Sequence, residues 1–134
     1  MNFFLDTNII IYFLKGIHPT IRDTLQRLNP NNVKIPSIVK AELLYGAEKS
    51  NLKVQNTLKI KQFLEPFEVI SFDDNCTTTY SLIRASLESK GSIIGPNDII
   101  IASTVLANNG TLVTHNVKEF MRIKNLKIEN WGVK

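Results

Sequence analysis

The sequence predicts an α/β fold, a three-layer α/β/α sandwich whose central sheet is mainly parallel. Short runs of β-branched and aromatic residues alternate along the chain with longer segments of helical periodicity, which is the order that builds parallel sheets. The chain has 134 residues, of which 43% are hydrophobic and 21% charged, and this is enough for one hydrophobic core. It shows no internal repeat, low-complexity tract or linker. We therefore expect a single domain over residues 1–134.

The first quarter of the chain predicts two strands and two helices. A short apolar run ends at Asp6, and the next segment is expected to be helical despite its β-branched residues. Farther along, Ile21, Leu25 and Leu28 have the i, i+4, i+7 spacing of an amphipathic helix, which Asn29 and Pro30 terminate. The expected elements are a strand over 2–5, helices over 8–15 and 20–28, and a strand over 33–36.

The middle of the chain predicts three helices and one strand. Ser37 is expected to be the N-cap of the first helix, Pro66 stops the second, and Asp73 caps the third, which Gly91 ends. The expected elements are helices over 37–47 and 52–64, a strand over 67–72, and a long helix over 73–90. The candidate core residues of the second helix are Leu52, Leu58, Phe63 and Leu64.

The last part predicts a helix over 97–108 closed by Asn109-Gly110, a strand over 111–114, a short helix from 117 and a strand over 126–129. In parallel sheets of this kind, ligands bind beyond the carboxyl ends of the strands, where consecutive loops converge. Polar residues that directly follow a strand are therefore the first candidates for a functional site.

Composition excludes several classes of protein. The apolar stretch over 9–14 is far shorter than the roughly 20 residues of a membrane helix, and it lacks the features of a signal peptide, so we expect a cytoplasmic protein without a membrane partner. Cys76 is the single cysteine, and we expect a packed side chain there. The net charge of +4 favours polyanionic or acidic partners, but the basic residues are scattered as on an ordinary solvated surface.

Carboxylates are the residues that could carry chemistry. Asp6-Thr7-Asn8 directly follows the first predicted strand, although Asp6 could equally be a plain helix cap. Glu42 lies in an apolar helical stretch, where it either reaches solvent or pairs with a cation, because burying it unpaired is costly. Asp98 falls in the first turn of a helix, where it complements the helix dipole, yet that helix is apolar enough to be packed in the core.

A fourth polar set, Thr114-His115-Asn116, follows a late strand, and Glu119 comes one helical turn after it. His115 lacks a His or Cys partner at metal-ligand spacing, and His18, in a loop next to a proline, has a weaker claim still.

Several carboxylates aimed at one sheet edge would repel one another and raise one another's pKa. A divalent cation would remove this conflict, and oxygen ligands without a His or Cys cluster favour Mg²⁺ or Mn²⁺ over zinc. Such an ion activates water and stabilises the charge that develops at a phosphodiester, so we expect phosphodiester hydrolysis.

Four segments in order resemble the PIN-domain ribonucleases, and most closely the VapC toxins of toxin-antitoxin pairs. They are Leu-Asp-Thr-Asn at 5–8, the glutamate helix Ala-Glu-Leu-Leu-Tyr-Gly-Ala at 41–47, Pro-x-Asp-x-x-Ile-Ala at 96–102 and Leu-Val-Thr-x-Asn-x-x-Glu-Phe at 112–120. No single motif is decisive, but the resemblance covers almost the whole chain.

The resemblance implies a PIN-like fold and an acidic triad of Asp6, Glu42 and Asp98, with Asp6 and Asp98 as the direct metal ligands. It leaves the fourth position open between Glu119, which is charged, and Asn116, which is neutral and would position water or substrate together with Thr7, Asn8 and Thr114. It also implies transfer RNA as substrate, a VapB-like antitoxin, a homodimer, and a higher assembly with antitoxin and operator DNA.

Other classes of function fit less well. A haloacid-dehalogenase-like phosphatase would need a second aspartate where Asn8 stands, and a receiver-like signalling domain would need a lysine near Thr114. A binding module without catalysis, whose acids serve as helix caps, is the remaining alternative. The loss of metal-dependent RNA cleavage on replacing Asp6 or Asp98 would separate it from a nuclease.

Overall fold

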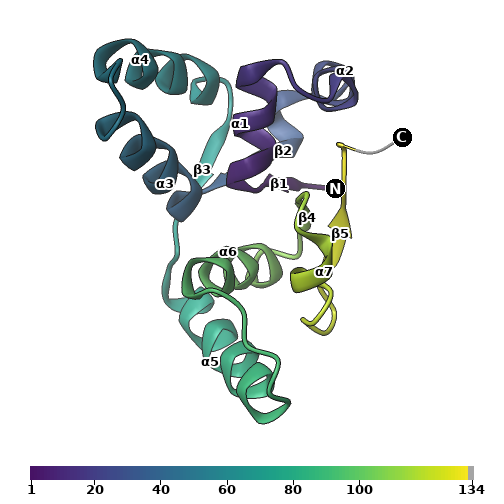
Figure 1. Ribbon diagram of the computed structural model, residues 1–134. Helices are drawn as coiled ribbons and strands as arrows, with labels where there is room; N and C mark the ends of the chain where they lie inside the picture. Colours follow the sequence, from purple (N-terminus) through teal and green to yellow (C-terminus); the bar gives the residue numbers. More distant parts are fainter. Residues whose placement is uncertain (133–134) are drawn as a thin grey trace.

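The computed structural model describes residues 1–132, which form a five-stranded sheet between two layers of helices (Figure 1). All four pairs of neighbouring strands are parallel, in the order β3-β2-β1-β4-β5. The strands are β1 (Phe3–Leu5), β2 (Val33–Pro36), β3 (Glu68–Ile70), β4 (Thr111–Val113) and β5 (Lys127–Glu129). The expected α/β sandwich with a parallel sheet is confirmed.

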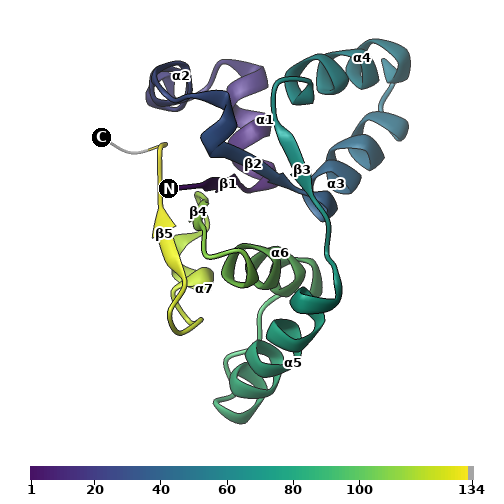
Figure 2. The same cartoon turned by 180° about the vertical axis from the view of Figure 1, so that it is seen from behind.

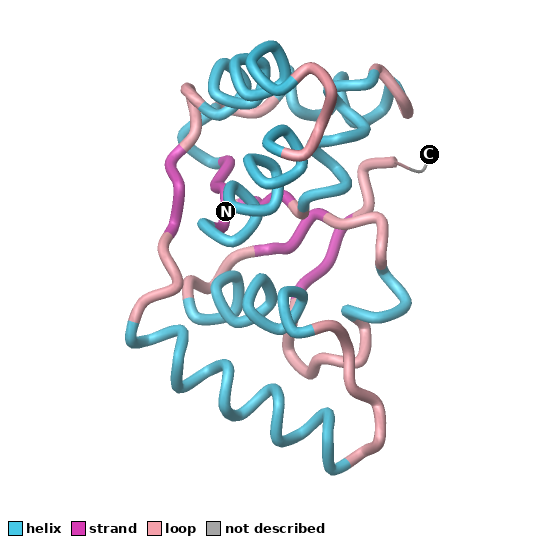
Figure 3. Tube along the Cα trace, turned by 60° about the vertical axis from the view of Figure 1, so that its left-hand side comes forward, coloured by secondary structure: helices cyan, strands magenta, loops and turns pink. Residues whose placement is uncertain are grey.

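The helices lie on both faces of the sheet because the chain reverses direction at β3. It first moves from β1 through β2 to β3 and then crosses back to β4 and β5, and right-handed crossovers place these two sets of connections on opposite faces. Figures 1 and 2 show the first four helices on one face and the last three on the other, and Figure 3 shows the thin layer of strands between them. The helices are α1 (Thr7–Lys15), α2 (Pro19–Arg27), α3 (Ser37–Glu48), α4 (Lys53–Leu64), α5 (Asp74–Ser89), α6 (Pro96–Ala107) and α7 (Val117–Phe120), and a 3₁₀ turn spans Pro30–Asn32.

Local capping explains where several helices begin and end, within two residues of the sequence prediction. The Asp73 carboxylate accepts a hydrogen bond from the Cys76 N–H at 3.2 Å, which is the predicted N-cap of α5. Gly91 follows the end of α5 with a φ of +65°, and Gly16 ends α1 with a φ of +71°, a backbone conformation that glycine adopts without a steric penalty.

The predicted N-cap role of Ser37 is wrong. Ser37 is the first residue of α3, Pro36 occupies the cap position, and no side chain within residues 1–132 caps this helix. The Ser37 hydroxyl instead accepts a hydrogen bond from the Phe72 N–H at 3.3 Å, in the segment that follows β3. This tertiary contact with the segment after β3 uses the hydroxyl that the local sequence assigned to the cap.

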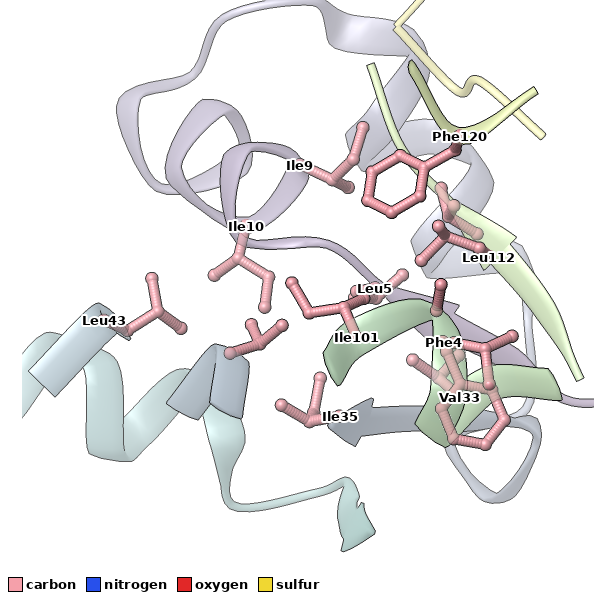
Figure 4. Packing of buried hydrophobic residues seen from close by; sticks show 14 of the residues in the cluster. Phe4, Leu5, Ile9, Ile10, Val33, Ile35, Leu43, Ile101, Leu112 and Phe120 are labelled. Carbon is pink, nitrogen blue, oxygen red and sulfur yellow. The ribbon is translucent and has the colours of Figure 1, made fainter. Parts of the chain in front are cut away.

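The core lies between the sheet and the helices that cover it. Figure 4 shows side chains from α1, α3, α6 and three strands meeting there, among them Ile10, Leu43, Ile101 and Ile35. Of the core residues predicted for α4, Leu64 is buried and Phe63 is partly buried, but Leu52 and Leu58 are 57% and 55% exposed. These two predictions are wrong because α4 packs mainly against α3, so only the side of α4 that bears Ile60 and Leu64 is covered.

The turn before β4 requires glycine for a steric reason. Asn109 has a φ of +55°, and a Cβ at Gly110 would overlap the buried Phe4 ring. The Asn109-Gly110 pair therefore both closes α6, as predicted, and lets β4 lie against β1. Cys76 is buried as expected. No helix within residues 1–132 is both long and apolar enough to cross a membrane.

Candidate active site

The carboxyl ends of β1 and β4 mark the point where the connections of the sheet diverge. The two strands are neighbours, with Leu5 paired to Val113, and the Asp6 N–H donates to the Val113 carbonyl at 2.9 Å. From this point the chain leads from β1 into α1 on one face and from β4 into α7 on the other (Figure 1). Such a switch point opens a crevice at the edge of a parallel sheet, and this is where ligands bind in open α/β folds.

Asp6 lies at this switch point and is buried, with 5% of its surface exposed. One carboxylate oxygen accepts the Thr7 N–H at 2.7 Å, which caps α1, and the other accepts the Thr114 hydroxyl, also at 2.7 Å. Burial raises the pKa of Asp6 above its usual value, the two hydrogen bonds oppose this increase, and the nearby Glu42 charge adds to it. Asp6 is thus both the helix cap and a buried acid that the Thr114 hydroxyl orients.

The Thr114 hydroxyl takes part in two hydrogen bonds, one as donor and one as acceptor. Its oxygen accepts the Asn116 N–H at 2.9 Å, so the hydroxyl proton is directed at Asp6. Thr114 itself is fully buried. The strand end and the loop after it therefore form a fixed support for one oxygen of Asp6.

Glu42, on α3, is tied to the same place by two neutral donors. The Thr7 hydroxyl donates to one of its oxygens at 2.9 Å, and the Asn97 side-chain amide approaches the other at 3.4 Å. Thr7 thus contacts Asp6 through its backbone and Glu42 through its side chain. Sequence reasoning expected Glu42 to reach solvent or a cation, and it did not identify Asn97, whose only signal is its position beside Asp98 at the start of α6.

Asp98 lies half-buried in the first turn of α6, and its surroundings raise its pKa to about 6. Burial is the largest cause, followed by repulsion from Asp6, Glu119 and Glu42 in that order. Each of these three repulsions requires the carboxylates to be close. The structure therefore places all four sequence-predicted acids near enough at one edge of the sheet for their charges to act on Asp98.

The other candidates lie around these acids in different ways. Glu119 is half-buried in the first turn of α7, and Asn116 precedes that helix and contacts Thr114 through its backbone N–H. Asn8 is exposed on the first turn of α1. Thr7 and Thr114 thus hold the acids directly, whereas Asn8 and Asn116 lie at the margin of the site.

The arrangement suits a cation that keeps part of its water shell. Within residues 1–132, no three His, Cys, Asp or Glu side chains converge closely enough to coordinate one ion by themselves. This differs from the closed set of four ligands that holds structural zinc. Mg²⁺ is typically bound by one or two carboxylates and several waters, which matches a pair such as Asp6 and Asp98 beside further acids.

Comparison with known proteins decides the family. The family model described as "PIN domain" matches residues 3–126. Ribonuclease VapC2 of Rickettsia felis is 48% identical over 132 residues, covering 98% of each chain. The chain belongs to the PIN-domain family. Within it, the chain belongs to the VapC ribonucleases, as the resemblance predicted.

Other VapC proteins and their complexes support the same placement. The tRNA(fMet)-specific endonuclease VapC of Shigella flexneri is 35% identical over 98% of this chain and 99% of its own. The VapBC2 structure from Rickettsia felis, bound to a promoter DNA fragment, contains a chain that superposes with a TM-score of 0.92 over 98% of this chain and 99% of its own, at 48% identity. The DNA-bound VapBC of Salmonella typhimurium gives a TM-score of 0.92 at 37% identity, covering 98% of each chain.

Proposed function

We propose that this VapC chain is a metal-dependent endoribonuclease, the toxin of a toxin-antitoxin pair, which works as one PIN-like domain in the cytoplasm. The observation that carries the proposal is the meeting of Asp6, Glu42, Asp98 and Glu119 at the switch point of the sheet, where burial and then repulsion from the other three acids raise the pKa of Asp98 to about 6. Four carboxylates crowded at one edge destabilise the fold unless a cation joins them, so a site of this kind needs a functional reason.

In this proposal, Asp6 and Asp98 hold Mg²⁺, or Mn²⁺ in its place, and Glu42 and Glu119 complete the acidic set. A bound divalent ion supplies the positive charge that activates a water and stabilises the phosphate in the transition state. The chain's own residues orient the acids. Thr114 and Thr7 fix the two oxygens of Asp6, and Thr7 and Asn97 fix Glu42. Asn8 and Asn116, at the margin of the site, are assigned to positioning water or RNA.

We assign transfer RNA as the substrate class. The support is the printed name of the Shigella flexneri relative, a tRNA(fMet)-specific endonuclease. The net charge of +4 agrees with a polyanionic substrate. We extend the assignment to an assembly with the antitoxin on operator DNA, in line with the promoter-bound VapBC2 structure of Rickettsia felis. We also expect the chain to form a homodimer.

Cleavage of purified transfer RNA by the full-length protein is expected to fall by at least about 100-fold in EDTA and to return with excess Mg²⁺ or Mn²⁺. Ca²⁺ is the control ion, because it has the same charge but prefers more ligands at longer distances. Gel analysis of the RNA fragments gives the rates. Full activity in EDTA would defeat the metal-dependent mechanism. RNA binding without cleavage in any of these ions would favour the non-catalytic module.

A groove beside the acids supports the antitoxin part of the proposal. It has a volume of about 440 Å³, lies between α1, α3 and α4, and reaches Glu42. Its lining is largely apolar, with two lysines, and includes Ile11, Leu14, Lys15, Leu43, Lys59 and Ile60. We assign this groove to an apolar segment of a VapB-like antitoxin whose acidic residues face the lysines and whose cation faces Glu42.

Leu14→Glu is expected to weaken inhibition by the VapB protein of the Rickettsia felis VapBC2 complex by at least about 10-fold, because it places a charge in the apolar groove. Leu14 is 38% exposed, so the substitution leaves the core intact. Titration of transfer RNA cleavage with that antitoxin measures the effect. Leu82→Glu, at a 68% exposed leucine on α5, is the matched control. Equal inhibition of both variants would place the antitoxin elsewhere.

A further inference from the structure

Three aromatic side chains cluster in a part of the molecule that the proposed chemistry does not use. The rings of His18 and His115, the two histidines of the chain, stack with centroids 5.7 Å apart and an interplanar angle of 24°. Tyr12 meets both of them edge-on, at 5.2 Å from His18 and 5.5 Å from His115. We call Tyr12, His18 and His115 the ring cluster.

The ring cluster joins three segments that are distant in sequence. Tyr12 lies on α1, His18 in the loop before α2, and His115 in the loop after β4. The segment after β5 closes one side, since a Cβ at Gly132 would lie 3.3 Å from His115 Nδ1 and 3.7 Å from His18 Cδ2. Figures 1 and 2 show this segment turning up from β5 toward α2.

His18 takes its place at a conformational cost. Its φ of +56° is unfavourable for a residue with a Cβ, and the following Pro19 restricts its backbone further. No side chain of the described residues caps α2 through this position. The His18 carbonyl accepts the Ile21 N–H at 2.9 Å at the start of α2, so the backbone of His18 serves the helix while its side chain is left to the ring cluster.

The ring of His115 is held in one orientation. The Asn130 amide oxygen accepts the Gly132 N–H at 2.9 Å, which turns the amide nitrogen toward His115 Nδ1 at 3.5 Å. The Asn130 amide nitrogen therefore lies against the Nδ1 edge of the His115 ring. His115 is nevertheless exposed, so one face or edge of its ring is open to a ligand.

The ring cluster lies next to the acids along the chain. His115 directly follows Thr114, whose hydroxyl contacts Asp6, and Tyr12 lies on the helix that Asp6 caps. Without a cation the acidic site repels RNA phosphates, so contacts that are not ionic would help to hold an RNA strand beside it. Aromatic rings supply such energy, because every nucleobase has a face that can stack.

We propose that Tyr12, His18 and His115 form a stacking site for an unpaired nucleobase of the RNA substrate, adjacent to the phosphodiester that is cut. The inference rests on the proposed function and adds the part of the site that binds a base by stacking. His115 provides the open ring, and Tyr12 and His18 hold it in place. Metal binding is a poor use of this cluster, since the two histidine rings stack rather than direct their nitrogens at one point.

The test measures binding in EDTA, so it does not depend on cleavage. A fluorescein-labelled single-stranded RNA of mixed sequence is titrated with the full chain and followed by anisotropy, and the emission of Trp131, the single tryptophan, two residues after β5, gives a second signal. His115→Ala is expected to weaken binding roughly 10-fold, because stacking on one aromatic ring is lost. His115→Phe, which keeps an aromatic face, is expected to bind within about threefold of the unchanged protein.

An RNA backbone of equal length without bases is the decisive probe. It is expected to bind equally, within about twofold, to the unchanged protein and to His115→Ala, because no base is present to stack. Tyr80, on α5, forms an edge-on pair with Phe72, which precedes that helix. Tyr80→Ala is the matched aromatic control and should leave RNA affinity unchanged. Thermal unfolding of each variant checks that the fold is retained.

Three results would overturn the inference. If His115→Ala lost the same affinity for the base-free backbone, His115 would contact the phosphates and not a base. If His115→Phe lost as much RNA affinity as His115→Ala, His115 would act through a hydrogen bond and not through stacking. Unchanged RNA binding combined with lost inhibition by the Rickettsia felis VapB protein would make the cluster a protein-binding surface. If the protein binds bases as expected but cuts no RNA, the stacking site would be supported and the nuclease proposal contradicted. The failures of the two proposals are therefore distinguishable.

Discussion

Asp98→Asn is expected to lower metal-dependent RNA cleavage by at least about 100-fold while making the folded protein more stable. The substitution keeps the shape of the side chain but removes the charge that we assign to binding the ion. It also removes the repulsion that Asp98 shares with Asp6, Glu119 and Glu42. Steady-state cleavage of transfer RNA gives the first effect, and thermal or urea unfolding in EDTA gives the second.

The two effects of Asp98→Asn have opposite signs, and this distinguishes a functional acid from a structural one. At pH 7.5 we expect a gain of about 1 kcal/mol in the free energy of unfolding, a figure reduced for the solvent around a half-exposed carboxylate. Asp74→Asn, at an exposed acid in the first turn of α5, is the matched control and should change neither property. A loss of stability in Asp98→Asn would show that this carboxylate serves mainly as a helix cap.

The gain in stability should depend on pH with a defined sign. The folded-state pKa of Asp98 is raised to about 6 from a reference of 3.8, so the folded protein binds this proton more tightly than the unfolded chain does. The ionised Asp98 therefore makes its full destabilising contribution above pH 6. This contribution disappears as the pH falls through 6 toward 4. The difference between the unchanged protein and Asp98→Asn should accordingly narrow between pH 7.5 and pH 5 in EDTA.

The sequence predicted the parts of the site that depend on local signals. Asp6 follows an apolar strand and Asp98 follows a proline at a helix start, and both patterns place a side chain at the end of an element. The parallel order of the sheet then brings those ends to one edge. The fold and the meeting of the acids could thus be predicted without knowing any contact between side chains.

The remaining contacts depend on how the elements pack against one another. The contact between Asn97 and Glu42 depends on how the start of α6 is positioned against α3, which no local sequence pattern encodes. The Ser37 hydroxyl does not cap α3 because it accepts a hydrogen bond from the Phe72 N–H, in the segment after β3. Leu52 was predicted to lie in the core, yet it is exposed at the start of α4, which packs mainly against α3.

The ring cluster shows the same limit more sharply. His18 and His115 lie 97 positions apart in a chain of 134 residues, and each looks unremarkable among its neighbours in sequence. Their stacking follows from the turn between α1 and α2 and from the place of β4 beside β1, that is, from topology. Side chains that act in pairs across such distances can be found only once the fold is known.

Thr114→Val is expected to lower cleavage by roughly 10-fold near neutral pH, because it removes the buried donor that orients Asp6. Valine has the same shape but leaves one oxygen of Asp6 and the Asn116 N–H without their Thr114 partner. We also expect a loss of about 1–2 kcal/mol in the free energy of unfolding. Thr111→Val, the same change at the other end of β4, is the matched control.

The pH dependence of Thr114→Val carries the decisive information. The Thr114 hydrogen bond lowers the pKa of Asp6, so its removal raises that pKa further. The acidic limb of the pH–rate profile should therefore move to higher pH, and the deficit should be largest near pH 6 and smaller near pH 8.5. Thr114→Ser, which keeps the hydroxyl, should restore the profile. A deficit that stays constant across this range would mean that Thr114 positions Asp6 without helping to keep it ionised.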